Sequence, residues 1–186
     1  MKNLTNFFAH AGFEGDALEQ IVTAFIPREY KKGEHFVEEG QIGNHLGFVE
    51  KGVFQYYLAL DGEEKTTYTC SDNSLIVSLV SLFKQIPSRI NIRALKNSEV
   101  YLIDKKSLIE LQQEVPGFKD FYIGLIEWQI GCIDETRLDA ITLTPTQRYL
   151  KLLENEPHLL QEVPLKYIAS ILGVTERHLS RIRKEI

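Results

Sequence analysis

The sequence predicts an α+β protein with a strand-rich front, one long helix and a short helical end. Three observations lead to this prediction. From about residue 20 to 112, short runs rich in Val, Ile, Phe and Tyr alternate with turns that contain Gly or Asp. After Pro116, a proline-free stretch has apolar residues at helical spacing. The final segment, from Thr144 onward, has helical patterns interrupted by prolines and by one glycine.

The composition is that of a folded globular protein. The chain has 186 residues, of which 44% are hydrophobic and 25% charged, enough for one or two domains with a sizeable core. These values exclude collagen, mucin-like stalks and extended disorder. No apolar run reaches the roughly 18 residues of a membrane span, and the first residues lack a signal-peptide core. Cys70 and Cys132 make no disulfide framework, so we expect a cytoplasmic protein with reduced thiols.

The strand-rich front predicts an antiparallel β architecture. Asp61-Gly62 lies between two apolar runs, and this dipeptide is among the strongest short signals for a β-hairpin. Many short strands at about 8–12-residue spacing favour a sandwich, a jelly roll or a barrel. About 20 residues before the strands have a helical pattern. The expected strands lie in the runs GEHFVEEG, HLGFVEKG, VFQYYLAL, EKTTYTC, RINIRAL and EVYLID.

The long helix has two adjacent apolar stripes. The first stripe is Phe118, Phe121, Leu125, Trp128 and Cys132, and the second is Ile123, Ile126, Ile130 and Ile133. One stripe is expected to lie on the β domain and the other on a partner helix, because a small domain rarely covers both. The alternative is that both stripes are core. We expect a homodimer seam from about Gly117 to Ala140, with Leu125, Trp128 and Cys132 as its main contacts.

The last segment, PLKYIASILGVTERHLSRIRKEI, predicts a helix, a tight turn and a second helix. Ala169 is small where the helices cross, Gly173 permits a positive φ in the turn, and Leu179 points back between the helices. Thr175 is expected to cap the second helix. This Ala-x3-Gly-x5-Leu spacing indicates a helix-turn-helix. The alternative is an ordinary helix pair with a solvated charged face.

The polar face of the second helix carries the candidate DNA-binding residues. Forked guanidinium groups and short polar tips suit base edges and phosphates. From Thr144 to Ile186 there are seven Lys or Arg against five Asp or Glu, a net charge of +2, whereas the whole chain carries −5. A basic end on an acidic body is typical of a protein with two tasks. The candidates are Thr175, Glu176, Arg177, Ser180, Arg181 and Lys184.

No catalytic or metal motif accompanies this pattern. The five histidines have none of the H-x-H or H-E-x-x-H spacings of metal sites. The chain also lacks G-x-S-x-G, the P-loop and G-x-G-x-x-G. We therefore expect no enzyme activity, no catalytic residues and no metal.

Taken together, the segments resemble the Crp/Fnr family of bacterial transcription regulators, the cyclic-AMP receptor protein family. The resemblance lies in KKGEHFVEEGQ, HLGFVEKGVFQYYLALDGEEKT and LGVTERHLSRIRK, with glycines at strand ends matched by Gly33, Gly40, Gly52 and Gly62. It implies a cyclic-nucleotide-binding-like sensor β-roll over 1–115, a dimerisation helix over 116–142 and a helix-turn-helix domain over 143–186. The implied partners are double-stranded DNA, a second copy of the chain and RNA polymerase, with no membrane.

The sequence departs from the family at the phosphate-binding cassette. Members that bind cyclic AMP have a pattern close to G-E-L-x-L-F followed by R-S-A-x-V-x-A, where this chain has SLVSLFKQIPSRINIRA. Ser78 replaces the glycine and Leu79 the ribose-binding glutamate, and either Ser88 or Arg89 takes the position of the phosphate arginine. Leu79 cannot accept a hydrogen bond from a ribose hydroxyl. We therefore expect no cyclic AMP in the usual mode, and either no effector or a less polar one.

The expected effector pocket lies between the cassette and the long helix. Its residues are Ser78, Leu79, Leu82, Ser88 and Arg89, with Trp128 and Cys132 opposite. A second departure is that the sequence stops at Ile186, so we expect no β-hairpin wing after the second helix. Two alternatives to a DNA-binding regulator stay open: a sensor or interaction module without specific DNA binding, and a cupin-like enzyme.

Overall fold

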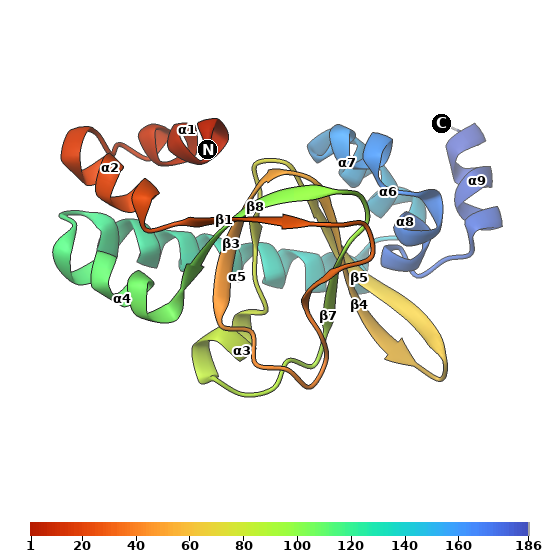
Figure 1. Cartoon of the computed structure of the whole chain (residues 1–186). Coiled ribbons are helices and arrows are strands. Elements are labelled where there is room, and N and C mark those ends of the chain that lie inside the picture. The colour runs from red at the N-terminus through yellow and green to blue at the C-terminus, as the bar shows by residue number, and fades with distance from the viewer. Residues whose placement is uncertain (186) are drawn as a thin grey trace.

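The protein, described here for residues 1–185 by a computed structural model, is a β-roll with helices at both ends and one long helix beside it (Figure 1). The β-roll consists of two four-stranded antiparallel sheets, in the orders β1-β8-β3-β6 and β2-β7-β4-β5. This confirms the α+β class and the antiparallel β architecture, for which the strand pattern had left a sandwich, a jelly roll or a barrel open. The strands are β1 Ile26–Tyr30, β2 His35–Val37, β3 His45–Lys51, β4 Val53–Leu60, β5 Glu63–Ser71, β6 Leu75–Ile76, β7 Asn91–Ala94 and β8 Ser98–Asp104.

The predicted hairpin joins β4 to β5. Leu60 pairs with Glu63 across a two-residue turn, in which Asp61 has φ 52° and Gly62 has φ 81°. Positive φ at both positions matches the right-handed twist of the flanking strands. The hairpin therefore forms for the local reason that the sequence supplies.

The two sheets enclose an apolar core. Phe54, Ile76, Ile92 and Val100 are at most 1% exposed and pack in one cluster. These side chains come from β4, β6, β7 and β8, so the core joins both sheets. The mostly apolar strands of the sequence are explained by this two-sided packing.

A second core, rich in phenylalanine, lies at the N-terminal end. Phe8 of α1 (Lys2–His10), Phe25 and Phe118 of α5 (Phe118–Thr142) are at most 3% exposed and pack in one cluster. Helices α2 (Gly15–Thr23) and α4 (Lys105–Glu114) complete the cluster. This core holds the beginning of α5 against the rest of the protomer.

Several short elements escaped the sequence interpretation. Helices α3 (Leu79–Lys84) and α4 lie in the stretch expected to be mostly strands, and β1 and β6 were not predicted. Helix α4 begins where the carboxylate of Asp104 accepts a hydrogen bond from the Ser107 amide at 2.7 Å, an N-cap that fixes the helix start. Pro157 begins helix α7 (Pro157–Glu162) rather than a plain connection, because proline is well suited to the first helical position.

The two apolar stripes of α5 face different surroundings. In the first stripe, Phe118 is buried and Phe121, Leu125 and Cys132 are half-buried. The second stripe is largely open to solvent. Its exposed members are Ile123 at 43%, Ile130 at 60% and Ile133 at 50%.

Trp128 is the exception to this division. It belongs to the first stripe by spacing but is 64% exposed. The structure therefore turns the first stripe toward its own protomer, except at Trp128, and leaves the second stripe exposed, except at the half-buried Ile126.

Four helices form the C-terminal end: α6 Pro145–Asn155, α7, α8 Leu165–Ile171 and α9 Glu176–Glu185. Ile168, Leu179 and Ile182 form the centre of their core, which also takes in Val53 of β4 and Leu95. The C-terminal helices therefore share a core with the β-roll. Ile186, the last residue of the expected 143–186 domain, lies outside the described residues.

Candidate nucleic-acid interface and cassette region

Helices α8 and α9 are joined by a tight turn. Gly173 has φ 67°, and its amide donates to the Ser170 carbonyl at 3.0 Å. The Val174 amide donates to the Ala169 carbonyl at 2.9 Å, which closes the end of α8. Ala169 is 2% exposed and Leu179 is fully buried, so the small and the large side chain meet in the angle between the helices.

The start of α9 is capped by Thr175. Its hydroxyl accepts a hydrogen bond from the His178 amide at 3.2 Å, which satisfies one of the free N–H groups of the first turn. Arg148 of α6 stabilises the C-terminal end of α8, because its Nη2 donates to the Leu172 carbonyl at 2.8 Å. The pair is therefore fixed at both ends of its turn.

The outer face of α9 carries the candidate DNA-binding side chains. Leu179 and Ile182 point inward and are buried. Thr175, Glu176, Arg177, Arg181 and Lys184 are exposed, and Ser180 is half-buried. The structure thus gathers all six candidates around the exposed sides of one helix.

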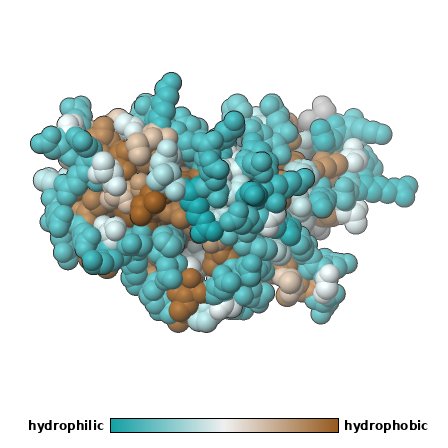
Figure 2. Space-filling model, in the orientation of Figure 1, coloured by the Kyte–Doolittle hydropathy of each residue, from teal (hydrophilic) through white to brown (hydrophobic). Residues whose placement is uncertain are grey.

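The cations of this face are available for a partner. Arg181 lies 4.0 Å from Glu185, a distance at which an exposed pair contributes little. Within residues 1–185 the ion pairs involve neither Arg177 nor Lys184. Figure 2 shows a largely hydrophilic surface over this end of the molecule. A helix with a basic, unpaired outer face is suited to phosphates and base edges.

In the cassette region, residues 77–94, the structure distinguishes the two alignments of the phosphate arginine. Ser88 is 3% exposed and its hydroxyl lies 2.9 Å from that of Ser78, which is 4% exposed. Arg89 is exposed. Both residues lie in the loop before β7, with Arg89 at a bend, and their burial places the serine inward and the arginine at the surface.

The hydroxyls of Ser81 and Ser88 are hydrogen-bonded within the chain. The Ser88 hydroxyl donates to the Ile90 carbonyl at 2.8 Å. The Ser81 hydroxyl accepts from the Gly43 amide at 2.8 Å and donates to the Ile86 carbonyl at 2.6 Å. The Ser81 hydroxyl therefore takes up the Gly43 amide, a donor that a bound anion could otherwise use.

Tyr56 of β4 closes the region from the side of the second sheet. Its hydroxyl accepts from the Val77 amide at 3.1 Å. Burial raises the pKa of Tyr56 well above its usual value, so the hydroxyl stays neutral. Neighbouring Cys70 of β5 is also buried, and burial raises the pKa of its thiol to about 12. Neither group supplies charge to a ligand at neutral pH.

The other expected pocket residues are dispersed. Leu79 is half-buried at the start of α3, and Leu82 is 2% exposed and packs into the phenylalanine-rich core. Cys132 lies near Tyr68 of β5, whereas Trp128 is exposed on α5. The structure brings together Ser78 and Ser88 but does not gather the seven expected residues around one cavity.

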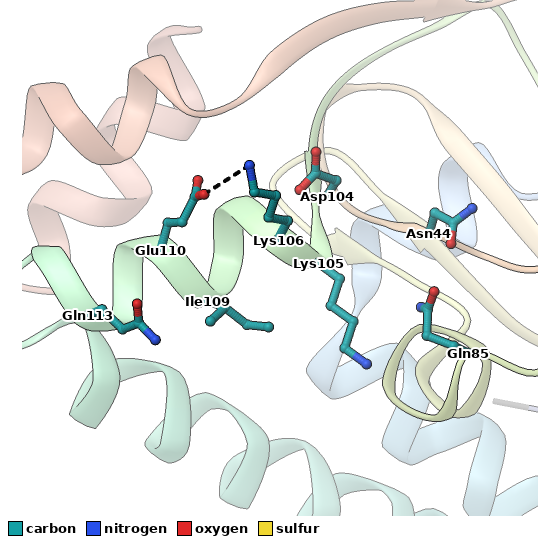
Figure 3. A pocket seen from close by; sticks show the side chains of 8 residues that line it. All are labelled: Asn44, Gln85, Asp104, Lys105, Lys106, Ile109, Glu110 and Gln113. Carbon is teal, nitrogen blue, oxygen red and sulfur yellow. Dashed lines mark ion pairs between the residues drawn. The ribbon is translucent and has the colours of Figure 1, made fainter.

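Two surface depressions lie elsewhere. The larger, of about 600 Å³, is open and lies between α3 and α4 (Figure 3). Its charged groups have local roles: Lys106 pairs with Glu110 at 3.3 Å, and Asp104 caps α4. The smaller, of about 140 Å³, is lined by residues from Arg28 to His45. Neither depression is lined by Ser78, Leu79 or Ser88.

The described residues contain neither a candidate metal cluster nor a candidate membrane span. Within residues 1–185, no three His, Cys, Asp or Glu side chains are grouped so that they could hold a metal ion. No helix in the same part of the chain is long and apolar enough to span a bilayer.

The sequence interpretation missed the contact between the C-terminal helices and the β-roll. The Thr66 amide of β5 donates to the Ser170 hydroxyl of α8 at 2.8 Å, and Lys96 pairs with Glu162 of α7 at 2.8 Å. Thr66 and Ser170 are 104 residues apart in the chain. No local pattern signals such a contact, because neither residue type nor spacing is distinctive.

Comparisons with known proteins agree with this architecture. Residues 27–115 match the family described as the cyclic nucleotide-binding domain. No curated protein matches the chain by sequence.

Three solved structures have a similar fold. FixK2 from Bradyrhizobium japonicum is 18% identical, with a TM-score of 0.72 over 87% of this chain and 83% of its own. A protein of Eubacterium rectale, described as a Crp/Fnr-family transcriptional regulator, is 17% identical, with a TM-score of 0.67 over 97% and 87%. Catabolite activator protein of Thermus thermophilus is 18% identical, with a TM-score of 0.60 over 94% and 84%. At these identities the likeness concerns the fold.

Proposed function

We propose that the chain acts as a homodimeric, sequence-specific DNA-binding transcription regulator. Its residues 27–115 match the cyclic nucleotide-binding domain family, and its fold is similar to that of Crp/Fnr regulators. The observation that carries the proposal is the α8–α9 pair, in which a capped helix presents Arg177, Arg181 and Lys184 to solvent. Residues 143–186 are the proposed DNA-binding domain and 1–115 the proposed sensor-type domain, with RNA polymerase as a further proposed partner.

In this proposal α9 enters the major groove. Arg177, Arg181 and Lys184 follow i, i+4, i+7 spacing and share one side of the helix. Arg181, near the middle, is the proposed reader of a guanine, because its fork matches the O6 and N7 acceptors. Lys184 is assigned to phosphates, which position the protein without reading sequence. Thr175, Glu176 and Ser180 complete the proposed contact face.

The free stripe of α5 supports the homodimer. Ile123, Ile126, Ile130 and Ile133 repeat at spacings of three and four, the pattern of a coiled-coil seam. We assign the seam to this stripe in place of Leu125, Trp128 and Cys132, because Leu125 and Cys132 are partly covered by their own protomer. A two-fold axis along this seam holds two copies of α9 about 34 Å apart, the separation of successive major grooves.

The cassette region supports regulation without a cyclic nucleotide bound in the usual mode. Ser88 replaces the inward cation, Arg89 points to solvent, and Leu79 lacks a ribose acceptor. A buried cyclic phosphate without a counter-charge is strongly disfavoured. The alternative of a less polar effector stays part of the proposal.

Selection of DNA sequences by the purified protein tests the function. The expected result is an enriched palindrome that binds more tightly than random duplex, with affinity that falls steeply as salt rises. A sensor or interaction module without specific DNA binding would enrich no sequence. A failure to enrich any sequence, with a folded dimer in hand, overturns the proposal.

A further inference from the structure

We propose that Ser170 is a positioning residue for DNA recognition: its contact with β5 holds the α8–α9 pair in one orientation on the β-roll without any effector. The dimer would then recognise two half-sites at one fixed spacing. This inference rests on the proposed DNA-binding function. It adds that the orientation of the DNA-binding end is built into the chain rather than imposed by a ligand.

The central contact is between an edge strand and a helix. β5 is the outermost strand of its sheet, and the pairing of β4 with β5 shifts between Tyr56 and Tyr57 at a bulge. Next to this irregularity, Thr66 pairs in register with Tyr57, and its amide donates to the Ser170 hydroxyl at 2.8 Å. Thr66 is 4% exposed, so water does not readily replace Ser170 as its partner.

A polar network fixes Thr66 from the opposite side. Its hydroxyl accepts from Gln55 Nε2 at 2.9 Å, and Gln55 is fully buried. Gln55 Oε1 in turn accepts from Arg93 Nη2 at 2.9 Å. Arg93 also forms a two-pronged pair with the Glu64 carboxylate at 2.9 and 2.6 Å. A network with each member hydrogen-bonded has little freedom to rearrange. The Thr66 amide is therefore held in a fixed position for its hydrogen bond to Ser170.

The contact with the β-roll and the proposed DNA-binding face lie on different sides of the C-terminal helices. The helices that lie against β5 are α7 and α8, and Val53 and Leu95 of the β-roll contribute to the core of the C-terminal helices. Helix α9 lies on the far side of α8 from the β-roll (Figure 1). The same contact that fixes the pair therefore leaves Arg177, Arg181 and Lys184 free.

Both partners of the contact belong to the chain itself, Thr66 in the β-roll and Ser170 in α8. A rigid arrangement avoids the ordering cost that a mobile DNA-binding end would bring on binding. It also ties affinity to geometry, because two fixed ends engage together only when the half-sites are correctly spaced. Spacing selectivity is therefore the property that reports on Ser170.

The experiment uses the full-length protein and palindromes whose half-sites are separated by about one helical turn or by a few base pairs more or less. Wild type is expected to lose at least about tenfold in affinity at the altered spacings. Ser170→Ala is expected to reduce this penalty to about twofold, with affinity for a single half-site unchanged. Ser170→Thr keeps the hydroxyl and should keep the selectivity. Ser74→Ala, in the turn between β5 and β6, is the matched control.

A second measurement separates this inference from the proposed function. Hydrogen exchange at the Thr66 amide should be faster in Ser170→Ala than in wild type, with or without DNA. If Ser170→Ala keeps the wild-type spacing preference or the wild-type exchange rate, the inference is wrong. A general loss of half-site affinity with a lower melting temperature, unrescued by Ser170→Thr, also overturns it. If wild type binds no DNA, the proposed function fails. The exchange rate of the Thr66 amide alone then decides whether the contact with Ser170 holds the α8–α9 pair on the β-roll.

Discussion

The cassette region and the α8–α9 pair differ in the direction that their polar side chains face. In the cassette region, Ser78, Ser81 and Ser88 point inward and bond to one another or to nearby backbone. On α9, Arg177 and Lys184 point outward, and no ion pair within residues 1–185 holds them. The serine hydroxyls of the first region are bonded within the chain, whereas the cationic side chains of the second face solvent.

This difference teaches that a shared fold does not carry a shared ligand. The β-roll keeps its strands and the short helix α3, because these depend on apolar packing and turns. Binding of a small anion depends on a few side chains, here Leu79, Ser88 and Arg89. Two expectations follow from this difference. The cassette region binds no cyclic nucleotide in the usual mode, and α9 binds DNA.

The largest expected effect concerns cyclic nucleotides. A missing ribose acceptor costs about 1–3 kcal/mol, and a buried phosphate without its cation costs about 3–5 kcal/mol more. Calorimetry with cyclic AMP and cyclic GMP is therefore expected to give dissociation constants weaker than about 1 mM, with 5′-AMP as the control ligand. A low micromolar dissociation constant for either cyclic nucleotide would show that the cassette region binds it despite Leu79, Ser88 and Arg89.

The second effect tests which stripe of α5 forms the dimer. Ile130→Asp should separate the protomers, because it buries an unpaired charge in the proposed seam. Affinity for a palindromic operator should then fall by about 10²- to 10⁴-fold as the second half-site is lost. Sedimentation velocity measures the dissociation.

Trp128→Asp is the matched control for that experiment, since Trp128 is 64% exposed and Ile130 is 60% exposed. The control should leave the dimer intact. If Trp128→Asp dissociates the dimer and Ile130→Asp does not, the first stripe rather than the second forms the dimer contact.

A third, smaller effect sharpens the assignment of α9. Arg181→Ala should weaken binding to the selected operator by about 1–3 kcal/mol, roughly 5- to 150-fold, and relax the preference at one base pair. Lys184→Ala should weaken all sequences alike and lower the salt slope by about one. Fluorescence anisotropy over a salt series measures both.

Arg183→Ala removes the same charge from another side of α9, two residues along, where the two side chains do not share a face. It should preserve the base preference. If Arg181→Ala and Arg183→Ala weaken binding to every sequence equally, α9 contacts phosphates without reading base pairs.

The smallest effect concerns the stability of the cassette region. Ser88→Ala removes the hydroxyl that joins Ser78 to the Ile90 carbonyl. The free energy of unfolding should fall by about 1 kcal/mol, while operator affinity stays unchanged. Urea denaturation measures the first and anisotropy the second. A change in operator affinity without a loss of stability would show that the cassette region still communicates with α9.

Local patterns predicted much of the fold. Asp61-Gly62 produced the hairpin, the apolar spacing after Pro116 produced α5, and Thr175 produced the cap of α9. The short elements escaped, since α3 has only six residues and lies in a strand-rich stretch. A helix of that length depends on packing such as that of Leu82, which is contributed by distant parts of the chain.

For the candidate site, the sequence by itself determined which side chains are available: serines and a leucine at the cassette, and basic residues at one face of α9. Composition and helical periodicity are local properties, so one chain displays them without any partner. Three features became apparent only from the fold: Ser88 rather than Arg89 faces inward, most of the second stripe of α5 is exposed, and Thr66 contacts Ser170. Each depends on contacts between segments that are distant in the sequence, such as the backbone bonds of Ser88 with Gly40 and Gln41, and a local pattern does not specify such contacts.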